Sequence, residues 1–265
     1  KNDMAAINNI LLFCVKKKVK CLQHVSSYSV LLGRNGNSIL DEAEYLERPL
    51  LPLGYSLSKW EVENRLYSMK RRGLPVNIFR LGNLTGSSVT GSFNEVDILS
   101  SIFMTSIQLG AIFDDNFQVD LTPVDYAAKS LVALCLLNET DEIYHIMNPK
   151  KFGFQDMMSY LQSIGVSMDC IPYHQWVMKL VILARQIRTP GVKIIPILFS
   201  DYKKKSYDFL DSYNVAHSAI SQERTLNKLD KLGVIFPEIS SRLLSLYYKR
   251  FSEYLGGAYD FNIYF

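Results

Sequence analysis

The sequence predicts an α/β fold with a parallel sheet, followed by a smaller and mostly helical C-terminal part. Short apolar strands alternate with helices of about 10–15 residues over residues 1–150. After residue 150 the pattern becomes largely helical. We therefore expect an α/β core in 1–150 and a helical subdomain in 151–265.

The elements of the core follow from the periodicity of its apolar residues. Residues 2–15 place apolar side chains at helical spacing. Further helices are expected at 55–72, at about 95–109, and from Pro123, a residue that favours the first turn of a helix. Strands are expected at 21–25, 76–81, 119–122 and 142–147. Residues 31–53 are rich in Gly, Asn and Pro and predict a loop.

The C-terminal part predicts two further helices. One carries Leu226, Leu229 and Leu232 on a single stripe, and the last is expected to begin at Pro237. We interpret the apolar and aromatic stripes at 176–183 and 243–255 as core. The alternative is that they form a docking surface or an acyl tunnel.

Composition and charge exclude several classes of protein. Of the 265 residues, 48% are hydrophobic and 21% charged, with a net charge of +3, which predicts a globular protein. No apolar run approaches the roughly 20 residues of a membrane span. The short basic clusters lack the interleaved aromatic residues of a nucleic-acid surface. We therefore expect neither a nucleic-acid partner nor a membrane partner.

Cysteine and histidine usage points to a cytoplasmic protein without a metal site. The four cysteines form no CxxC pair, the four histidines have no metal-ligand spacing, and the first residues lack the layout of a signal peptide. We expect the cysteines to be reduced thiols.

The most informative group of residues is Ser27, Tyr55 and Lys59. Tyr55 and Lys59 are four residues apart at a helix start, so they share one face. A nearby ammonium group favours the phenolate form of a tyrosine and lowers its pKa. A hydroxyl at the end of the preceding strand can polarise a carbonyl oxygen beside the tyrosine. Such a group can deliver a proton to an oxygen while hydride reaches the carbon. The lysine has further donors for a ribose diol.

Other interpretations of single residues stay open. A YxxxK pair occurs by chance about once in a chain of this length, and Ser26 competes with Ser27 for the catalytic role. Asn83 also fits a turn that binds no ligand. We expect His24 and His145 to be packed within their strands rather than catalytic.

Four segments in order along the chain resemble a known family: HVSSYSV, GYSLSKWEVEN, NIFRLGNLTG and VDLTPVDYAAKSLVAL. They are similar to the extended short-chain dehydrogenases/reductases. More narrowly, they resemble the thioester reductase domains that end nonribosomal peptide synthetases and carboxylic acid reductases. Ser27 stands where a threonine is common in that family, a change that keeps the hydroxyl. The C-terminal stretch from Arg224 to Phe251 resembles the closing helices of the family.

The resemblance implies a Rossmann-like, doubly wound core and a specific activity. Ser27, Tyr55 and Lys59 would be the catalytic triad, with Lys59 also contacting the cofactor. The turn Leu81, Gly82, Asn83 and Leu84 would pass the nicotinamide of NADPH. The substrate would be an acyl or peptidyl thioester on the phosphopantetheine arm of a carrier domain, released as an aldehyde or an alcohol. The rest of a multidomain synthetase would be the partner.

One expected motif is missing from the sequence. The GxxGxxG turn that holds the pyrophosphate of the cofactor does not occur in these 265 residues. We therefore expect that strands of the cofactor half precede Lys1 in a complete member, and that the serine strand lies at an uncovered edge of the sheet. The alternatives are a sugar-nucleotide epimerase or dehydratase, a fatty acyl-CoA reductase, or a catalytically incomplete fragment that acts as a scaffold.

Overall fold

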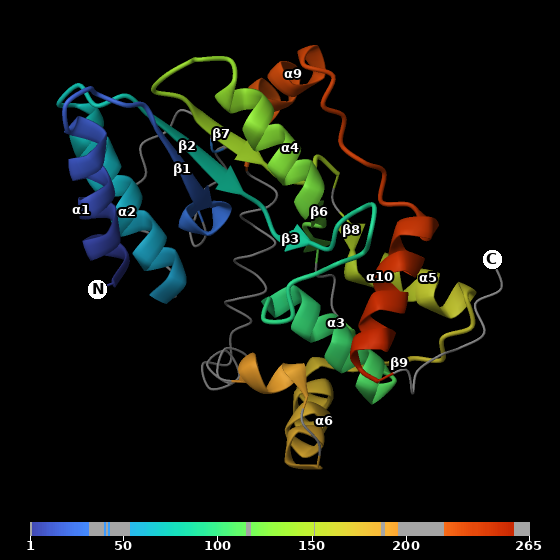
Figure 1. Cartoon of the computed structure of the whole chain (residues 1–265). Helices are drawn as coiled ribbons and strands as arrows, with labels where there is room; N and C mark the ends of the chain where they lie inside the picture. The colour runs from blue at the N-terminus through green and yellow to red at the C-terminus, as the bar shows by residue number, and fades with distance from the viewer. Residues whose placement is uncertain are drawn as a thin grey trace. The chain divides into compact units, whose positions relative to one another are not determined.

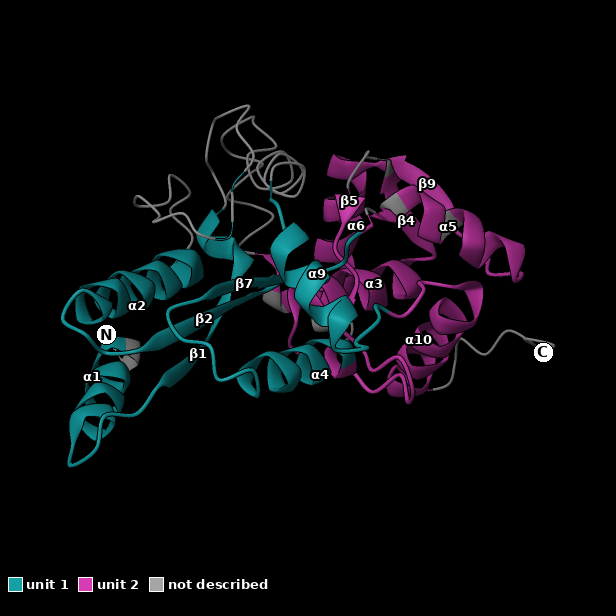
Figure 2. Ribbon diagram, turned by 90° about the horizontal axis from the view of Figure 1, so that it is seen from above, with its two compact units in different colours: residues 1–82, 126–149, 215–236 teal, residues 83–125, 150–214, 237–265 magenta. Residues whose placement is uncertain are grey.

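The computed structural model describes residues 2–31, 40, 42, 54–114, 118–150, 152–186, 189–195 and 220–256. The predicted loop at 31–53 lies almost wholly outside the described residues. The chain divides into two compact units, each assembled from three stretches of sequence (Figure 2). Unit 1 comprises residues 1–82, 126–149 and 215–236, and unit 2 comprises residues 83–125, 150–214 and 237–265.

Unit 1 is built on a three-stranded parallel sheet in the order β1-β2-β7 (Figure 1). The strands are β1 (Leu22–Ser27), β2 (Val76–Leu81) and β7 (Ile143–Ile146). Helices α2 (Gly54–Lys70) and α4 (Val124–Cys135) lie on opposite sides of this sheet (Figure 2). Within the described residues β1 pairs only with β2, so the serine strand lies at an edge, as expected.

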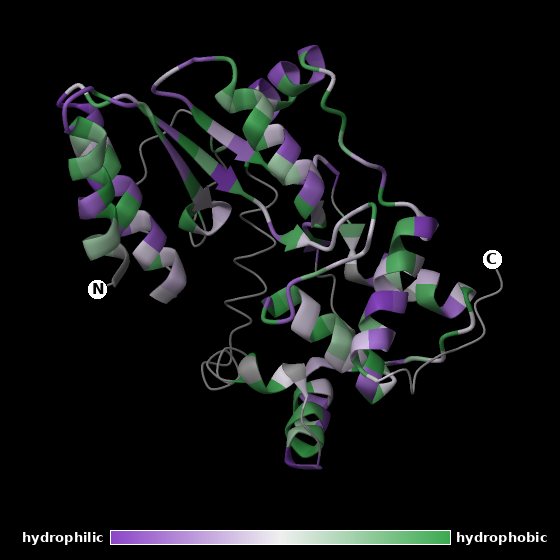
Figure 3. Ribbon diagram, viewed as in Figure 1, coloured by the Kyte–Doolittle hydropathy of each residue, from purple (hydrophilic) through white to green (hydrophobic). Residues whose placement is uncertain are grey.

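The core of unit 1 forms between α2 and one face of the sheet. Helix α1 (Asn2–Val15) and α2 bury apolar side chains against β2, because Val62 and Leu66 of α2 meet Val76 and Ile78. The opposite face of β2 carries Phe79, whose ring stacks on Tyr144 of β7 at 5.2 Å. Alternate residues of β2 therefore face α2, and Arg80 belongs to that set. Figure 3 shows hydrophilic residues among the hydrophobic ones along these strands.

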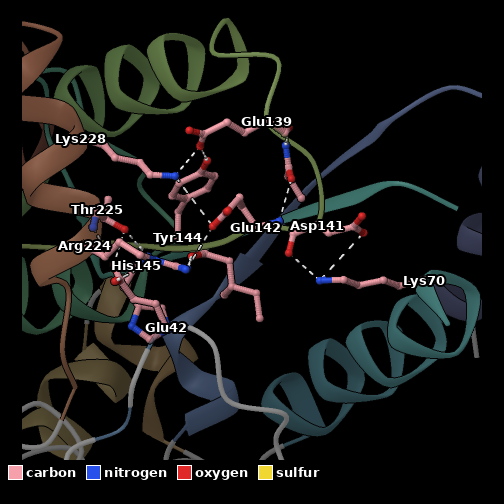
Figure 4. A network of polar contacts seen from close by, with 12 residues as sticks. Glu42, Lys70, Glu139, Asp141, Glu142, Tyr144, His145, Arg224, Thr225 and Lys228 are labelled. Atoms are coloured by element: carbon pink, nitrogen blue, oxygen red, sulfur yellow. Dashed lines mark hydrogen bonds and ion pairs between the residues drawn. The ribbon is translucent and has the colours of Figure 1, made fainter. Parts of the chain in front are cut away.

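Charged groups hold helix α9 (Glu223–Lys231) against Glu42 and against the residues just before β7 (Figure 4). The buried carboxylate of Glu42 accepts hydrogen bonds from the backbone N–H and the hydroxyl of Thr225 and lies 3.6 Å from Arg224 Nε. Lys228 forms ion pairs with Glu139 and Glu142. The carboxylate of Glu42 thus supplies a partner for one of the backbone N–H groups that the first turn of a helix leaves unpaired.

The described part of unit 2 combines helices with three pairs of short strands. Strands β3 (Leu84–Thr85) and β6 (Thr122–Pro123) are parallel, as are β4 (Ala111–Asp114) and β9 (Asp169–Pro172). Strands β5 (Gln118–Val119) and β8 (Phe152–Gly153) are antiparallel. Among its described residues, unit 2 has the helices α3 (Ile98–Leu109), α5 (Phe154–Ser163), α6 (Tyr173–Gln186), the short η2 (Pro190–Lys193) and α10 (Ser241–Tyr254).

The predicted α/β class with a parallel sheet is confirmed, and two elements differ from expectation. The strand expected at 119–122 is two short strands, β5 and β6, in different sheets. The last helix begins at Ser241 rather than Pro237, because the Ser240 hydroxyl accepts the backbone N–H of Leu243 at 3.4 Å and provides the N-cap. On α6, Trp176, Val177 and Leu180 are buried and belong to the core, whereas Met178 and Ile182 of the same stretch are about half exposed.

The domain boundary near residue 150 stays a prediction. Each of the two compact units contains residues from both sides of that point. Across the described ranges, every helix is too short or too polar to cross a membrane.

Candidate active site

Tyr55 and Lys59 lie one turn apart on the first turns of α2. The ammonium of Lys59 is 5.7 Å from the centre of the Tyr55 ring. The Tyr55 side chain is 60% exposed, and Lys59 is half-buried. The structure therefore places this predicted pair on one face of α2, with the tyrosine exposed to solvent.

Ser27 is the last residue of β1 and is buried. Its hydroxyl accepts a hydrogen bond from the backbone N–H of Ser29 at 3.2 Å, as the chain turns into the 3-10 helix η1 (Tyr28–Leu31). Helix α2 contacts both β1 and η1. The competing residue, Ser26, has a different contact, because its hydroxyl donates to the carboxylate of Glu63 at 2.5 Å.

The predicted cofactor turn begins beside Ser27. Leu81 is the register partner of Ser27 across β1 and β2, so the two residues lie side by side at the carboxyl ends of their strands. The backbone N–H of Gly82 donates to the Ile146 carbonyl at 2.8 Å. In open α/β sheets, ligands bind outside these strand ends. Ser27, Leu81 and Gly82 thus mark that end of the sheet in unit 1.

Asn83 and Leu84 belong to unit 2, where an acidic residue holds their turn. Asp120 is buried and accepts the backbone N–H of Asn83 at 2.8 Å and the hydroxyl of Thr122 at 2.6 Å. The Thr122 N–H donates in turn to the Asn83 carbonyl at 3.1 Å. Both backbone polar groups of Asn83 are therefore fixed.

The two strand histidines are packed, as expected. Burial lowers the pKa of His24 to about 4, with Glu63 acting to raise it and Lys59 to lower it. His145 is fully buried, and burial followed by the charge of Arg80 lowers its pKa to about 3. Both imidazoles are neutral at neutral pH.

Sequence reasoning missed the charged groups that support the site. Glu63 and Arg80 form a buried ion pair between α2 and β2, with a 2.8 Å contact from Arg80 Nη2 to Glu63 Oε2. The sequence carries a signal for each: Glu63 follows Lys59 by one helical turn, and Arg80 interrupts an apolar strand. Asp120 has no comparable signal, because its partner Asn83 is distant in sequence.

A small apolar cavity lies inside unit 2. Its volume is about 30 Å³. Aliphatic, aromatic and sulfur side chains of α3, α5 and α10 line it, among them Phe103, Ile107, Met157, Leu161, Leu244 and Phe251. In the described part of the chain, no cluster of three His, Cys, Asp or Glu side chains could hold a metal ion.

Comparison with known proteins finds a matching family for one part of the chain. Residues 2–131, just under half of the chain, match an NAD-binding family described as "Male sterility protein". The matched residues include Ser27, Tyr55, Lys59 and the turn from Leu81 to Leu84.

Similar proteins include parts of large synthetases. The terminal R domain of the myxalamid PKS-NRPS pathway is 29% identical with a TM-score of 0.80, over 95% of this chain and 62% of that chain. A linear gramicidin synthase of Brevibacillus parabrevis is 26% identical over 67% of this chain and 4% of its own length. The large polypeptide of the L-2-aminoadipate reductase of Candida glabrata is 31% identical over 63% of this chain and 13% of its own length. The chain thus spans a small fraction of these two relatives.

Proposed function

We propose that this chain is the catalytic part of an NADPH-dependent reductase that acts on a carrier-bound acyl or peptidyl thioester. The observation that supports this most is the arrangement at one end of the parallel sheet in unit 1. Ser27 and Leu81 are register partners there, and α2, which carries the Tyr55–Lys59 pair, packs against the strand and turn of Ser27.

The residues present fit a nicotinamide cofactor. The Lys59 ammonium offers three donors suited to a ribose diol, and the Ile146 carbonyl holds the backbone N–H of Gly82. Lys59, Leu81 and Gly82 of unit 1 would hold the nicotinamide side, and a cofactor contact of Asn83 and Leu84, which belong to unit 2, stays a prediction from the sequence. The cofactor, when bound, supplies a hydride.

Side chains of this protein would stabilise the negative charge that develops on the substrate and donate a proton to it. The hydroxyls of Ser27 and Tyr55 donate hydrogen bonds to the carbonyl oxygen of the thioester, where negative charge develops as the carbon is reduced. Tyr55 then transfers its proton to that oxygen, and Lys59 stabilises the phenolate that remains. The resulting thiohemiacetal breaks its carbon–sulfur bond, which gives an aldehyde and returns the thiol to the phosphopantetheine arm.

A reductase assay with matched variants tests this proposal. The full natural gene product is mixed with NADPH and an acyl-pantetheine thioester, and aldehyde and NADP⁺ are quantified together. Tyr55→Phe is expected to lower kcat by about 10²–10⁴-fold through loss of the proton donor. Ser27→Ala is expected to lower kcat by about 10²–10³-fold. Tyr254→Phe, which removes a hydroxyl that donates to Glu95 from a half-exposed residue of α10, is the control and keeps full activity.

Two outcomes would contradict the proposal. Turnover of a nucleotide sugar without thioester reduction would identify an epimerase or dehydratase. An inert full-length protein with bound NADPH would support a scaffold role.

A further inference from the structure

A buried ionic group joins the helix of the proposed active site to the sheet. The side chains of Arg80 and Glu63 are 0% and 1% exposed. Arg80 Nε lies 3.2 Å from both carboxylate oxygens of Glu63, and Nη2 lies 2.8 Å from Oε2. Burying two charges costs desolvation energy that their attraction often only balances. Stability alone is therefore a weak reason for this pair.

The pair is the centre of a larger network. Glu63 Oε1 accepts the Ser26 hydroxyl, and the Tyr67 hydroxyl accepts from Arg80 Nη2 at 3.2 Å. Arg80 Nη1 donates to His145 Nε2 at 3.2 Å, so His145 Nδ1 carries the hydrogen that it donates to the Ser221 carbonyl at 2.6 Å. One continuous set of hydrogen bonds thus connects α2 with all three strands of the sheet.

The network lies next to the proposed catalytic residues on both α2 and β1. On α2, Glu63 follows Lys59 by one turn and Tyr55 by two turns, so the three residues share a face. On β1, Ser26 is the neighbour of Ser27. A single carboxylate therefore bonds both the helix of the acid–base pair and the strand of the catalytic hydroxyl.

We propose that Glu63, held by Arg80, is a positioning residue that fixes α2 against β1 and so places Tyr55 and Lys59 relative to Ser27. This inference rests on the proposed function for the roles of those three residues. Apolar contacts between Val62, Leu66 and the sheet are non-directional and tolerate small shifts of the helix. A forked guanidinium–carboxylate contact fixes direction as well as distance.

The decisive experiment separates positioning from stability. Glu63→Gln leaves the Arg80 charge buried without its partner and is expected to lower the denaturation midpoint. The double variant Glu63→Met with Arg80→Met removes both charges and keeps the side-chain volume, so its midpoint is expected at or above that of the wild type. Its kcat for thioester reduction is nevertheless expected to fall by about 10²-fold, because small misplacements of reacting groups have effects of that size. Its KM for NADPH stays within about twofold.

A second pair of variants makes a smaller change and can be measured if the double variant does not fold. Ser26→Ala cuts only the hydrogen bond from β1 to Glu63 and leaves the ion pair intact. It is expected to lower kcat only several-fold at an unchanged midpoint, much less than Ser27→Ala, and Ser26→Thr, which restores a hydroxyl, recovers the rate. A loss as large as that expected for Ser27→Ala would make Ser26 the catalytic hydroxyl and would overturn the inference. Glu61→Met, at an exposed position of the same helix, is the matched control and changes neither quantity.

Amide hydrogen exchange gives a readout that does not depend on turnover. Faster exchange at 22–27 and 54–60 in the double variant, at equal global stability, supports positioning. Exchange equal to that of the wild type overturns it, as does a kcat that recovers together with the midpoint. If the wild-type protein reduces no thioester, the proposed function fails, while the exchange result still decides whether Glu63 fixes the helix.

Discussion

The buried imidazole of His145 makes the stability of this protein depend on pH. The side chain is fully buried on β7 between the Arg80 guanidinium and the Ser221 carbonyl. Burial first, and then the Arg80 charge, lowers its pKa to about 3, although the hydrogen bond to Ser221 acts in the opposite direction. The ordinary histidine pKa, which we take for the unfolded chain, is about 6.5.

The direction of the effect follows from the pH at which the folded and the unfolded chain each bind a proton at His145. Below about pH 6.5 the unfolded chain protonates this histidine, whereas the folded chain does not until about pH 3. The contribution of His145 is therefore fully present above pH 6.5 and is lost as the pH falls toward 3. Between pH 8 and pH 5 this one group removes about 2 kcal/mol from the free energy of unfolding.

Urea denaturation at pH 8 and pH 5 measures this loss, with His145→Gln as the variant. Glutamine keeps an acceptor for Arg80 but does not titrate, so the variant is expected to lose about 2 kcal/mol less than the wild type between the two pH values. Comparing the two losses cancels the contribution of His24 and the carboxylates. His174→Gln, at an exposed position, is the control and follows the wild type. An equal loss in wild type and His145→Gln would refute the reasoning.

Three further predictions concern residues that hold local structure within the two units. Asp120→Ala frees the turn at Asn83 and is expected to weaken NADPH binding several-fold in a fluorescence titration. Glu42→Ala removes the buried acceptor of Thr225 at the start of α9, and thermal denaturation should show a loss of about 1–3 kcal/mol. Gly191→Ala places a Cβ atom into the packing of η2 on α3 and is expected to cost about 1–3 kcal/mol in urea denaturation.

Two of these predictions have a control within the chain. For Gly191, an added Cβ would overlap the Thr105 hydroxyl, whereas at Gly54 it would meet nothing within 4 Å, so Gly54→Ala should keep full stability. For Glu42, the exposed Glu223 on α9 serves as comparison. For Asp120, binding that matches the wild type would show that the turn does not contact the cofactor.

Local patterns are enough to predict most elements of unit 1. The apolar run at 76–81 predicts a strand at its observed bounds, and the helix expected at 55–72 is α2 (Gly54–Lys70). Both depend on residues that are neighbours in sequence. The expected start of the last helix is wrong, since Pro237 is a permissive signal and the Ser240 hydroxyl provides the actual cap. Short strands such as β5 and β6 carry too few residues for a periodic signal.

The supporting charges of the site could not be predicted in the same way. Glu63 on a helix and Arg80 near the end of a strand each have, beside the signals named above, an ordinary solvent-exposed interpretation, and no pattern in the sequence pairs the two residues. Only the parallel pairing of β1 with β2 brings Arg80 beside Ser26, its register partner, and so places both next to the carboxylate of Glu63. The proposed catalytic groups could be selected from the sequence because their chemistry requires particular residue types at a short spacing. The ion pair that supports them requires only two opposite charges at positions that the fold brings together. Many pairs of positions in a sequence could supply such charges.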